Sequence, residues 1–186
     1  CSVCGKTTTS TLYAPKTVTL SAASYTYDGK AKKPSVTVKD SKGNKIGSRY
    51  YTVSYPSGRK NVGKYTVKVT FKGNYIGSKS ATFVIKPKGT SVSKVKAAKK
   101  GFKVTWKKQA TQTSGYQVQY GTSSKFKKAK TVTISKNKTT SKSVGKLSAK
   151  KKYYVRVRTY KTVKIGGKSV KLYSGWSKAK SVTTKK

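Results

Sequence analysis

The chain has 186 residues, enough for one or two domains, and its charge is one-sided: 45 Lys and Arg face 2 acids, Asp28 and Asp40, for a net charge of +43. With no His, a Ser/His/Asp triad is excluded within this chain. The two Asp residues are separated by turn and strand, which argues against a catalytic carboxylate pair, and they are too few for a calcium site. We therefore predict that it is not an enzyme and holds no cofactor. No apolar run is long enough to cross a membrane.

The hydrophobic residues, 33% of the chain, predict strands. They occur in alternating runs rich in Tyr, Val and Thr, which is typical of half-buried strands. High charge with modest hydrophobicity also fits a disordered chain. The ordered alternation favours the folded alternative.

The first residues form a Cys-x-x-Cys-Gly motif, in which Cys1 and Cys4 have the spacing of one zinc-ribbon knuckle. A tetrahedral site needs four ligands, and the chain has no other Cys and no His. Three interpretations stay open: a knuckle truncated upstream, an inert pair, or a lipidated Cys1. We assign residues 1–17 to this partial knuckle and a linker, in which Pro15 is expected to prevent a strand.

A first domain is predicted over residues 18–87. Short alternating runs are separated by turn signals such as Asp28-Gly29 and Pro56-Ser57-Gly58, at the spacing of about 8–12 residues that a β-sandwich shows. In the run 65–71, Tyr65, Val67, Val69 and Phe71 are expected to face the core.

Five pieces of this domain resemble, in order, the bacterial Ig-like domain of the MBG type. The pieces are Tyr27-Asp28-Gly29-Lys30, Tyr51-Thr52-Val53-Ser54-Tyr55, Asn61-Val62-Gly63-Lys64-Tyr65, Lys72-Gly73-Asn74-Tyr75 and Phe83-Val84-Ile85. The resemblance implies a sandwich without catalytic residues.

Residues 88–90 read as a short linker, and a second domain is predicted over 91–186. Its central strand is Lys150–Tyr160: Tyr153, Val155, Val157 and Thr159 share the inward face, and Tyr154, Arg156, Arg158 and Tyr160 share the outward face. Further along, Gly166-Gly167 is a hairpin turn between runs 163–165 and 170–172.

This second half resembles a fibronectin type III domain. The resemblance rests on Trp106, on Gly115-Tyr116-Gln117-Val118-Gln119-Tyr120, on Leu147 six residues before Tyr153, and on Tyr173-Ser174-Gly175-Trp176-Ser177. It implies a tyrosine corner, in which the Tyr153 hydroxyl bonds back to the backbone. The predicted fold class is all-β, two tandem β-sandwiches. The two resemblances together imply a large surface or secreted protein of a Gram-positive, Clostridia-like bacterium, placed outside the cell or in the cell wall.

Lysine clusters are the candidate binding residues, because an ammonium on a flexible stem suits phosphate or sulfate. The polyanion-binding candidates are Lys96, Lys99, Lys100, Lys103, Lys107, Lys108, Lys125, Lys127, Lys128, Lys130, Lys150, Lys151, Lys152, Arg156 and Arg158. Solvated strand faces are the alternative, since edge lysines also prevent sheet-to-sheet association. Stacking of bases on Tyr154 and Tyr160 is a further option.

Three functions stay open at this point. The first is a structural and adhesive spacer whose basic surface touches anionic polymers without specificity. The second is a dedicated binding module for DNA, teichoic acid or sulfated or sialylated glycans. The third is an accessory region of a secreted enzyme whose catalytic domain lies outside this chain. Self-association into fibres through an exposed edge strand is compatible with the sequence.

Overall fold

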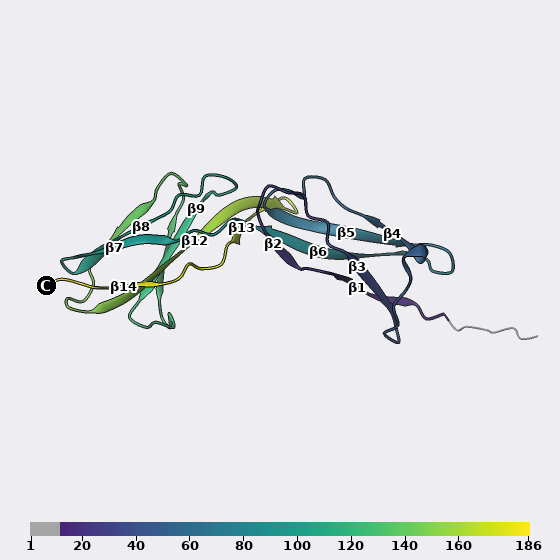
Figure 1. The fold of residues 1–186 in the computed structure, drawn as a ribbon, viewed down its shortest axis with the longest axis horizontal. Coiled ribbons are helices and arrows are strands. Elements are labelled where there is room, and N and C mark those ends of the chain that lie inside the picture. The colour runs from purple at the N-terminus through teal and green to yellow at the C-terminus, as the bar shows by residue number, and fades with distance from the viewer. Residues whose placement is uncertain (1–11) are drawn as a thin grey trace, which may run out of the picture. The chain divides into compact units, whose positions relative to one another are not determined.

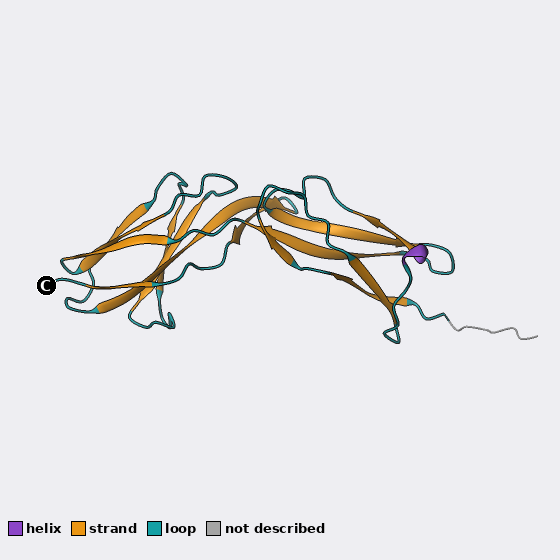
Figure 2. Ribbon diagram, in the orientation of Figure 1, coloured by secondary structure: helices purple, strands orange, loops and turns teal. Residues whose placement is uncertain are grey.

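The computed structural model describes residues 12–186, so the predicted knuckle at Cys1 and Cys4 lies outside the described residues. Within this part the chain is nearly all-β, and its one helical element is the short 3-10 helix η1 (Ser48–Tyr50) (Figures 1 and 2). The predicted fold class, two tandem β-sandwiches, is confirmed.

The first sandwich consists of a two-stranded sheet, β1-β3, and a four-stranded sheet in the order β2-β6-β5-β4. Its strands are β1 (Pro15–Leu20), β2 (Ser24–Thr26), β3 (Val36–Asp40), β4 (Tyr51–Ser54), β5 (Gly63–Phe71) and β6 (Ser78–Lys86). As predicted from the alternation, Val67, Val69 and Phe71 are buried on β5, and Tyr65 is half-buried.

β1 begins at Pro15, where we expected no strand. The β1–β3 register shifts between Pro15 and Thr17, so the proline occupies the irregular first position of the strand. A missing N–H is tolerated there, because no regular ladder bond depends on it.

The second sandwich consists of a three-stranded sheet, β11-β8-β7, and a five-stranded sheet, β10-β9-β12-β13, with β14 also paired to β12. Its strands are β7 (Val92–Ala98), β8 (Gly101–Trp106), β9 (Gly115–Gly121), β10 (Lys130–Ile134), β11 (Ser141–Val144), β12 (Lys152–Ile165), β13 (Lys168–Tyr173) and β14 (Lys180–Thr183). Its core includes Phe102, Val104, Tyr116, Val118 and Val155, all nearly inaccessible to solvent.

β12 is the predicted central strand, and its inward face is confirmed: Tyr153, Val155, Val157 and Thr159 are buried. The strand starts at Lys152 rather than Lys150, because Lys150 adopts a positive φ of 50°. It also runs on without a break through residues 163–165. Gly166 and Gly167 both have positive φ, as the predicted hairpin turn requires.

Tyr160 was predicted on the outward face, where it contacts the same Tyr173 ring as Arg158, yet its side chain is only 3% exposed. Its strand partner on β9 is Gly115, which has no side chain to keep the ring away from the backbone. A Cβ at Gly115 would lie 2.9 Å from the Tyr160 hydroxyl. Burial also raises the pKa of Tyr160.

The predicted tyrosine corner is confirmed, since the Tyr153 hydroxyl accepts a hydrogen bond of 3.3 Å from the Ser148 N–H. This bond fixes the loop before β12 to the strand itself.

The chain divides into two compact units that are not continuous in sequence. One contains the residues up to Ala23, Lys33–Ser57 and Tyr65–Phe83, and the other contains Ser24–Lys32, Gly58–Lys64 and Val84–Lys186. The predicted domain boundaries, 18–87 and 91–186 with a linker at 88–90, therefore stay a prediction.

Candidate anion-binding surface

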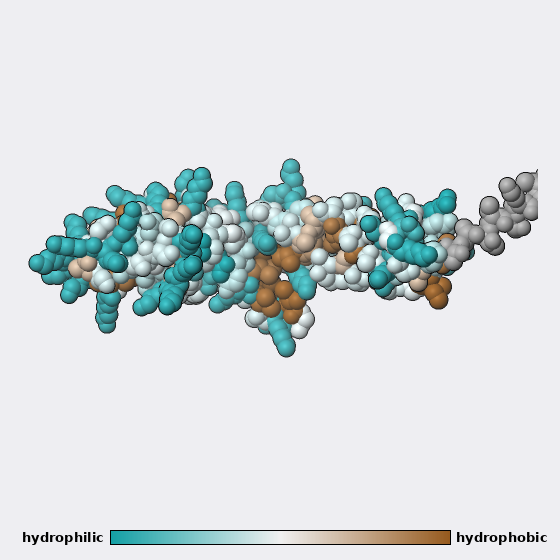
Figure 3. Space-filling model, turned by 90° about the horizontal axis from the view of Figure 1, so that it is seen from below, coloured by the Kyte–Doolittle hydropathy of each residue, from teal (hydrophilic) through white to brown (hydrophobic). Residues whose placement is uncertain are grey.

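The lysines predicted as polyanion contacts are all exposed, whereas Arg156 and Arg158 are half-buried. At the end of the second sandwich that carries the C-terminus, hydrophilic side chains project from the surface (Figure 3). The structure therefore separates the predicted residues into exposed ammonium groups and a packed arginine pair.

The outer face of the three-stranded sheet brings two of these lysines together. Lys96 on β7 lies directly opposite Lys103 on β8, and Ser143 on β11 is the next residue across the sheet. Like charges in directly opposite positions are destabilising. An anion bridging the two ammonium groups would relieve this repulsion.

A second group of lysines lies where three chain segments meet at one end of this sandwich. The Lys100 N–H donates to the Lys185 carbonyl at 3.0 Å, and the Lys100 carbonyl accepts from the Leu147 N–H at 2.9 Å. The Lys150 N–H donates to the Thr184 carbonyl at 3.1 Å. We call this group the lysine end, and it consists of Lys99, Lys100, Lys146, Lys150, Lys151 and Lys185.

Four exposed lysines of this sandwich have a left-handed backbone, namely Lys100, Lys128, Lys146 and Lys150, with φ between 44° and 57°. This conformation costs an L-residue roughly 1–2 kcal/mol, and glycine usually takes it. Lysine therefore occupies positions where glycine would be less strained. This favours the interpretation that the ammonium groups at these positions bind an anion.

A cavity of about 290 Å³ opens between the β9–β10 loop and the loop before β12. It is lined by the predicted residues Lys128 and Lys130 and by Lys146, which was not among the predicted residues. Lys146 was missed because it lies in a turn, where no periodic pattern assigns a direction to its side chain.

Arg156 and Arg158 are stacked into a ladder with aromatic rings. The Arg156 guanidinium lies 3.9 Å from the Phe126 ring centroid and 4.8 Å from that of Trp176, and Arg158 lies 4.3 Å from Trp176 and 4.0 Å from Tyr173. Such contacts are attractive because the ring face is electronegative. Trp176 is therefore shared by both cations.

The same arginines donate across the sheet. The Arg156 Nε lies 2.8 Å from Gln119 Oε1, and the Arg158 Nη2 lies 2.7 Å from Gln117 Oε1. Desolvation lowers the pKa of both arginines, although they stay charged at neutral pH. Arg156 Nε and Arg158 Nε and Nη2 thus have partners on β9, and both guanidinium groups lie against rings, so the two residues contribute to the architecture of the sheet. Their contact with a polyanion stays a prediction.

The segment that carries Trp176 is fixed by two serines. The Ser174 hydroxyl accepts the Thr159 N–H at 3.1 Å, and the Ser177 hydroxyl accepts the Val157 N–H at 3.0 Å. These bonds hold residues 174–177 along one edge of β12, between its pairings with β14 and β13, while the other edge of β12 is paired with β9.

The two acidic residues, Asp28 and Asp40, form hydrogen bonds with residues close to them in the sequence. The Asp28 carboxylate lies 2.5 Å from Lys32 Nζ, and this hydrogen bond lowers its pKa. At Asp40, desolvation opposes ionisation, but hydrogen bonds from Asn44 and Lys42 outweigh it and lower the pKa. Neither carboxylate faces the lysine clusters closely enough to form an ion pair among the described residues.

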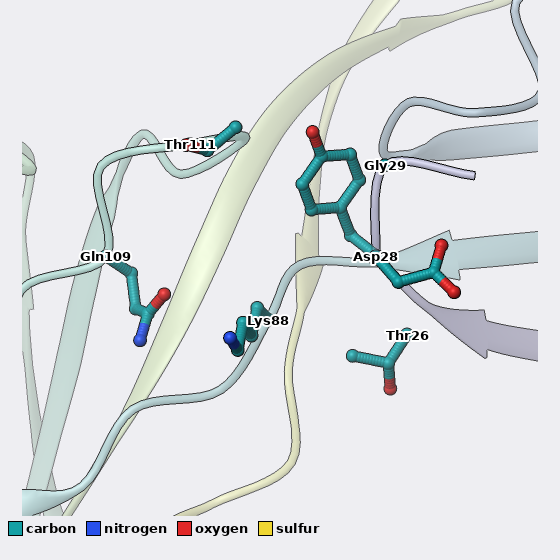
Figure 4. Close-up of a pocket in the computed structure, with 7 residues that line it drawn as sticks. Thr26, Asp28, Gly29, Lys88, Gln109 and Thr111 are labelled. Carbon is teal, nitrogen blue, oxygen red and sulfur yellow. The ribbon is translucent and has the colours of Figure 1, made fainter.

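Asp28 also lines a cavity of about 470 Å³, together with Thr26, Lys88, Gln109 and Thr111 (Figure 4). Figure 4 shows Asp28 as the one carboxylate among the labelled side chains, which leaves no carboxylate pair there. Across residues 12–186, no three His, Cys, Asp or Glu side chains gather as metal ligands. No helix in this part of the chain is long and apolar enough to span a membrane.

Comparison with known proteins gave two family matches. The model of the MBG domain matches residues 16–89, and that of the fibronectin type III domain matches residues 85–174. No curated protein matches the chain.

Similar solved structures include the crystal structure of chicken CNTN1 FN1-FN3 domains, at 20% identity and a TM-score of 0.46, covering 93% of this chain and 67% of that one. A two-domain fibronectin type III segment from chicken tenascin shows 18% identity and a TM-score of 0.44, covering 92% of this chain and 99% of that one.

Proposed function

We propose that this chain, in which an MBG domain is followed in tandem by a fibronectin type III domain, is a non-catalytic spacer and adhesion module that contacts anionic polymers. Both domain types are typical of extracellular structural or adhesive modules. We place the module at a cell wall or in a matrix, where such polymers are abundant.

The observation that carries the proposal is the exposure of lysines that lack acidic partners. The whole chain has two carboxylates, and the described ion pair uses one of them, Asp28. The remaining ammonium groups repel one another, and a polyanion would neutralise them while releasing its own counterions.

Lysine point charges without a fixed geometry favour non-specific binding. We therefore expect affinity to follow the charge density of the polymer, whether it is teichoic acid, extracellular DNA or a host glycan. The arginines that would give a planar, directional contact are held in the ladder with Trp176.

The test is binding of the full chain to DNA, heparin and teichoic acid across a salt series, with uncharged dextran as the control polymer. Six to ten phosphate contacts should weaken binding about 10³–10⁵-fold between roughly 50 and 200 mM salt. Absence of binding to all three polyanions at the lowest salt, or equal binding to dextran, would refute the proposal.

A further inference from the structure

We propose that the cavity lined by Lys128, Lys130 and Lys146 binds one sulfate or phosphate ester carried as a side group on a sugar. This inference rests on the proposed function, because it gives the basic surface one preferred contact point. We call the cavity the three-lysine pocket.

The position of the three-lysine pocket follows from strand register. Lys130 is the first residue of β10 and lies opposite Tyr120 on β9, so the two side chains share one face of the sheet. Tyr120 is 8% exposed and belongs to the core. The Lys130 stem therefore extends over the open end of the core, on the inner side of the sheet.

The other two lysines come from loops on either side of this opening. Lys128 is in the β9–β10 loop and Lys146 is in the loop before β12, and both have a positive φ, of 51° and 57°. The conformation is strained for lysine, yet it places both residues at the rim of the same cavity.

Both loops are held in place by contacts of the backbone. Gly121 permits the close approach of Ala129, since a Cβ there would be 3.2 Å from the alanine Cβ. Within the β9–β10 loop, the Phe126 N–H donates to the Ser123 carbonyl and the Ala129 N–H donates to the Phe126 carbonyl. On the other side, Ser148 donates to the Tyr153 hydroxyl and Leu147 donates to the Lys100 carbonyl. A site formed before the ligand arrives loses less entropy on binding.

The lining is complementary to an oxyanion. The lining residues include three lysines and four residues that carry a hydroxyl, Tyr120, Thr122, Ser148 and Tyr153, and include no Asp or Glu. Lysine and hydroxyl donors suit the oxygens of a sulfate or phosphate group. Without an anion, the three like charges repel one another.

The size of the pocket favours a side group over a polymer backbone. Its volume of about 290 Å³ is near the lower limit for small-molecule sites, which begin at roughly 300 Å³. One esterified sugar unit is compatible with this space, whereas a nucleic acid presents its diesters along a continuous strand that would pass over the opening. We therefore assign the pocket to a glycan, with nucleic acid as the competing outcome of the test.

The experiment titrates the full ¹⁵N-labelled chain with glucose 6-sulfate, glucose 6-phosphate and glucose at physiological salt, and follows backbone amide shifts. We expect saturable shifts for either ester, confined to residues 121–130 and 145–148, and none for glucose. The two esters reveal which oxyanion is preferred. Shifts spread over the whole domain, or equal shifts with glucose, would overturn the inference.

Two triple variants separate this site from the general basic surface. Lys128→Gln with Lys130→Gln and Lys146→Gln should weaken ester binding about tenfold, by the sum of three exposed ion pairs. The control, Lys164→Gln with Lys168→Gln and Lys178→Gln, removes the same charge from exposed lysines on the β12–β13 hairpin and the segment before β14, which the candidate anion-binding surface does not include, and should leave ester binding unchanged. Far-UV circular dichroism and the melting temperature confirm that each variant folds.

The outcomes distinguish the pocket from the proposed function. Equal loss of ester and heparin binding in both triple variants would reject the pocket while leaving the non-specific module intact. Failure of the unmodified chain to bind heparin, DNA and teichoic acid at low salt would reject the proposed function itself. Selective loss of DNA binding, without any effect on the esters, would assign the pocket to nucleic acid and reject the glycan.

Discussion

Trp176 is the side chain on which two charged groups of the second sandwich depend, since both Arg156 and Arg158 stack on it. We expect Trp176→Ala to lower the free energy of unfolding by about 2–4 kcal/mol, because it removes a half-buried ring and two cation–π contacts. Urea denaturation measures the change. Trp176→Phe retains a ring and should lose less, and a loss below about 1 kcal/mol for the alanine variant would contradict the ladder's role.

Asp40 gives the first sandwich an acid-dependent turn. Its pKa in the fold lies below the ordinary value of 3.8, since the hydrogen bonds from Asn44 and Lys42 favour the charged carboxylate. The stabilisation of the fold by the charged Asp40 carboxylate is therefore complete above the ordinary pKa of 3.8, and it is lost as the pH falls through the lower pKa of the folded state. We expect Asp40→Asn to be less stable than the unmodified chain at neutral pH.

Denaturant unfolding from neutral pH down to about pH 2 checks this expectation. The difference between the two proteins should shrink as the Asp40 carboxylate is protonated. A difference that stays constant across the whole range would show that the charge of Asp40 does not stabilise the turn.

The pairing of β9 with β10 and β12 requires a glycine at position 115. A Cβ there would lie 2.0 Å from the Ile134 carbonyl oxygen and 2.9 Å from the Tyr160 hydroxyl. We expect Gly115→Ala to lower the free energy of unfolding by about 1–3 kcal/mol, because the backbone of β10 must move to make room for the new methyl group. Gly145→Ala is the matched control, since nothing lies within 4 Å of a Cβ at that position. Thermal melts of both variants compare the two, and equal losses would contradict the steric argument.

The strands were predictable because the alternation of apolar and polar residues is a local pattern, which can be recognised within a few consecutive residues. Each run such as Tyr65–Phe71 or Tyr153–Thr159 carries its own signal, and both proved to be buried on the expected face. Tyr160 keeps its outward face but is buried there, beside Gly115 and Tyr173, of which Gly115 is distant in the sequence. Periodicity assigns a side chain to a face of the sheet but does not reveal what covers that face.

The candidate site was less predictable for the same reason. The sequence predicts lysine clusters only from residues that are neighbours in the chain. The three-lysine pocket instead combines Lys128 from one loop, Lys130 from the start of β10 and Lys146 from another loop. The arginines looked like free surface cations, because Phe126 and Trp176, which stack on Arg156, lie far from it in the sequence. Only the paired strands bring these side chains together.

The whole chain carries a net charge of +43. Because of this charge, added salt should stabilise the free folded chain, whereas it should weaken binding of the chain to a polyanion. Like charges on the surface repel in the folded state, where they are closer together than in the extended chain. Salt screens this repulsion, with a Debye length of about 10 Å at 0.1 M falling to about 3 Å at 1 M. We expect the melting temperature of the free chain to rise with NaCl concentration.

A polyanion should reverse this dependence. Heparin binds the folded chain in preference to the unfolded one if the lysines act as an arranged surface, so at low salt it should raise the melting temperature by mass action. Added NaCl weakens that binding and removes the increment, even while it stabilises the free chain. Melts with and without heparin should therefore converge as salt rises, with dextran as the neutral control. Parallel curves would show that the folded arrangement of the lysines has no effect on binding, and a free chain insensitive to NaCl would show that the charge is too widely spaced to repel.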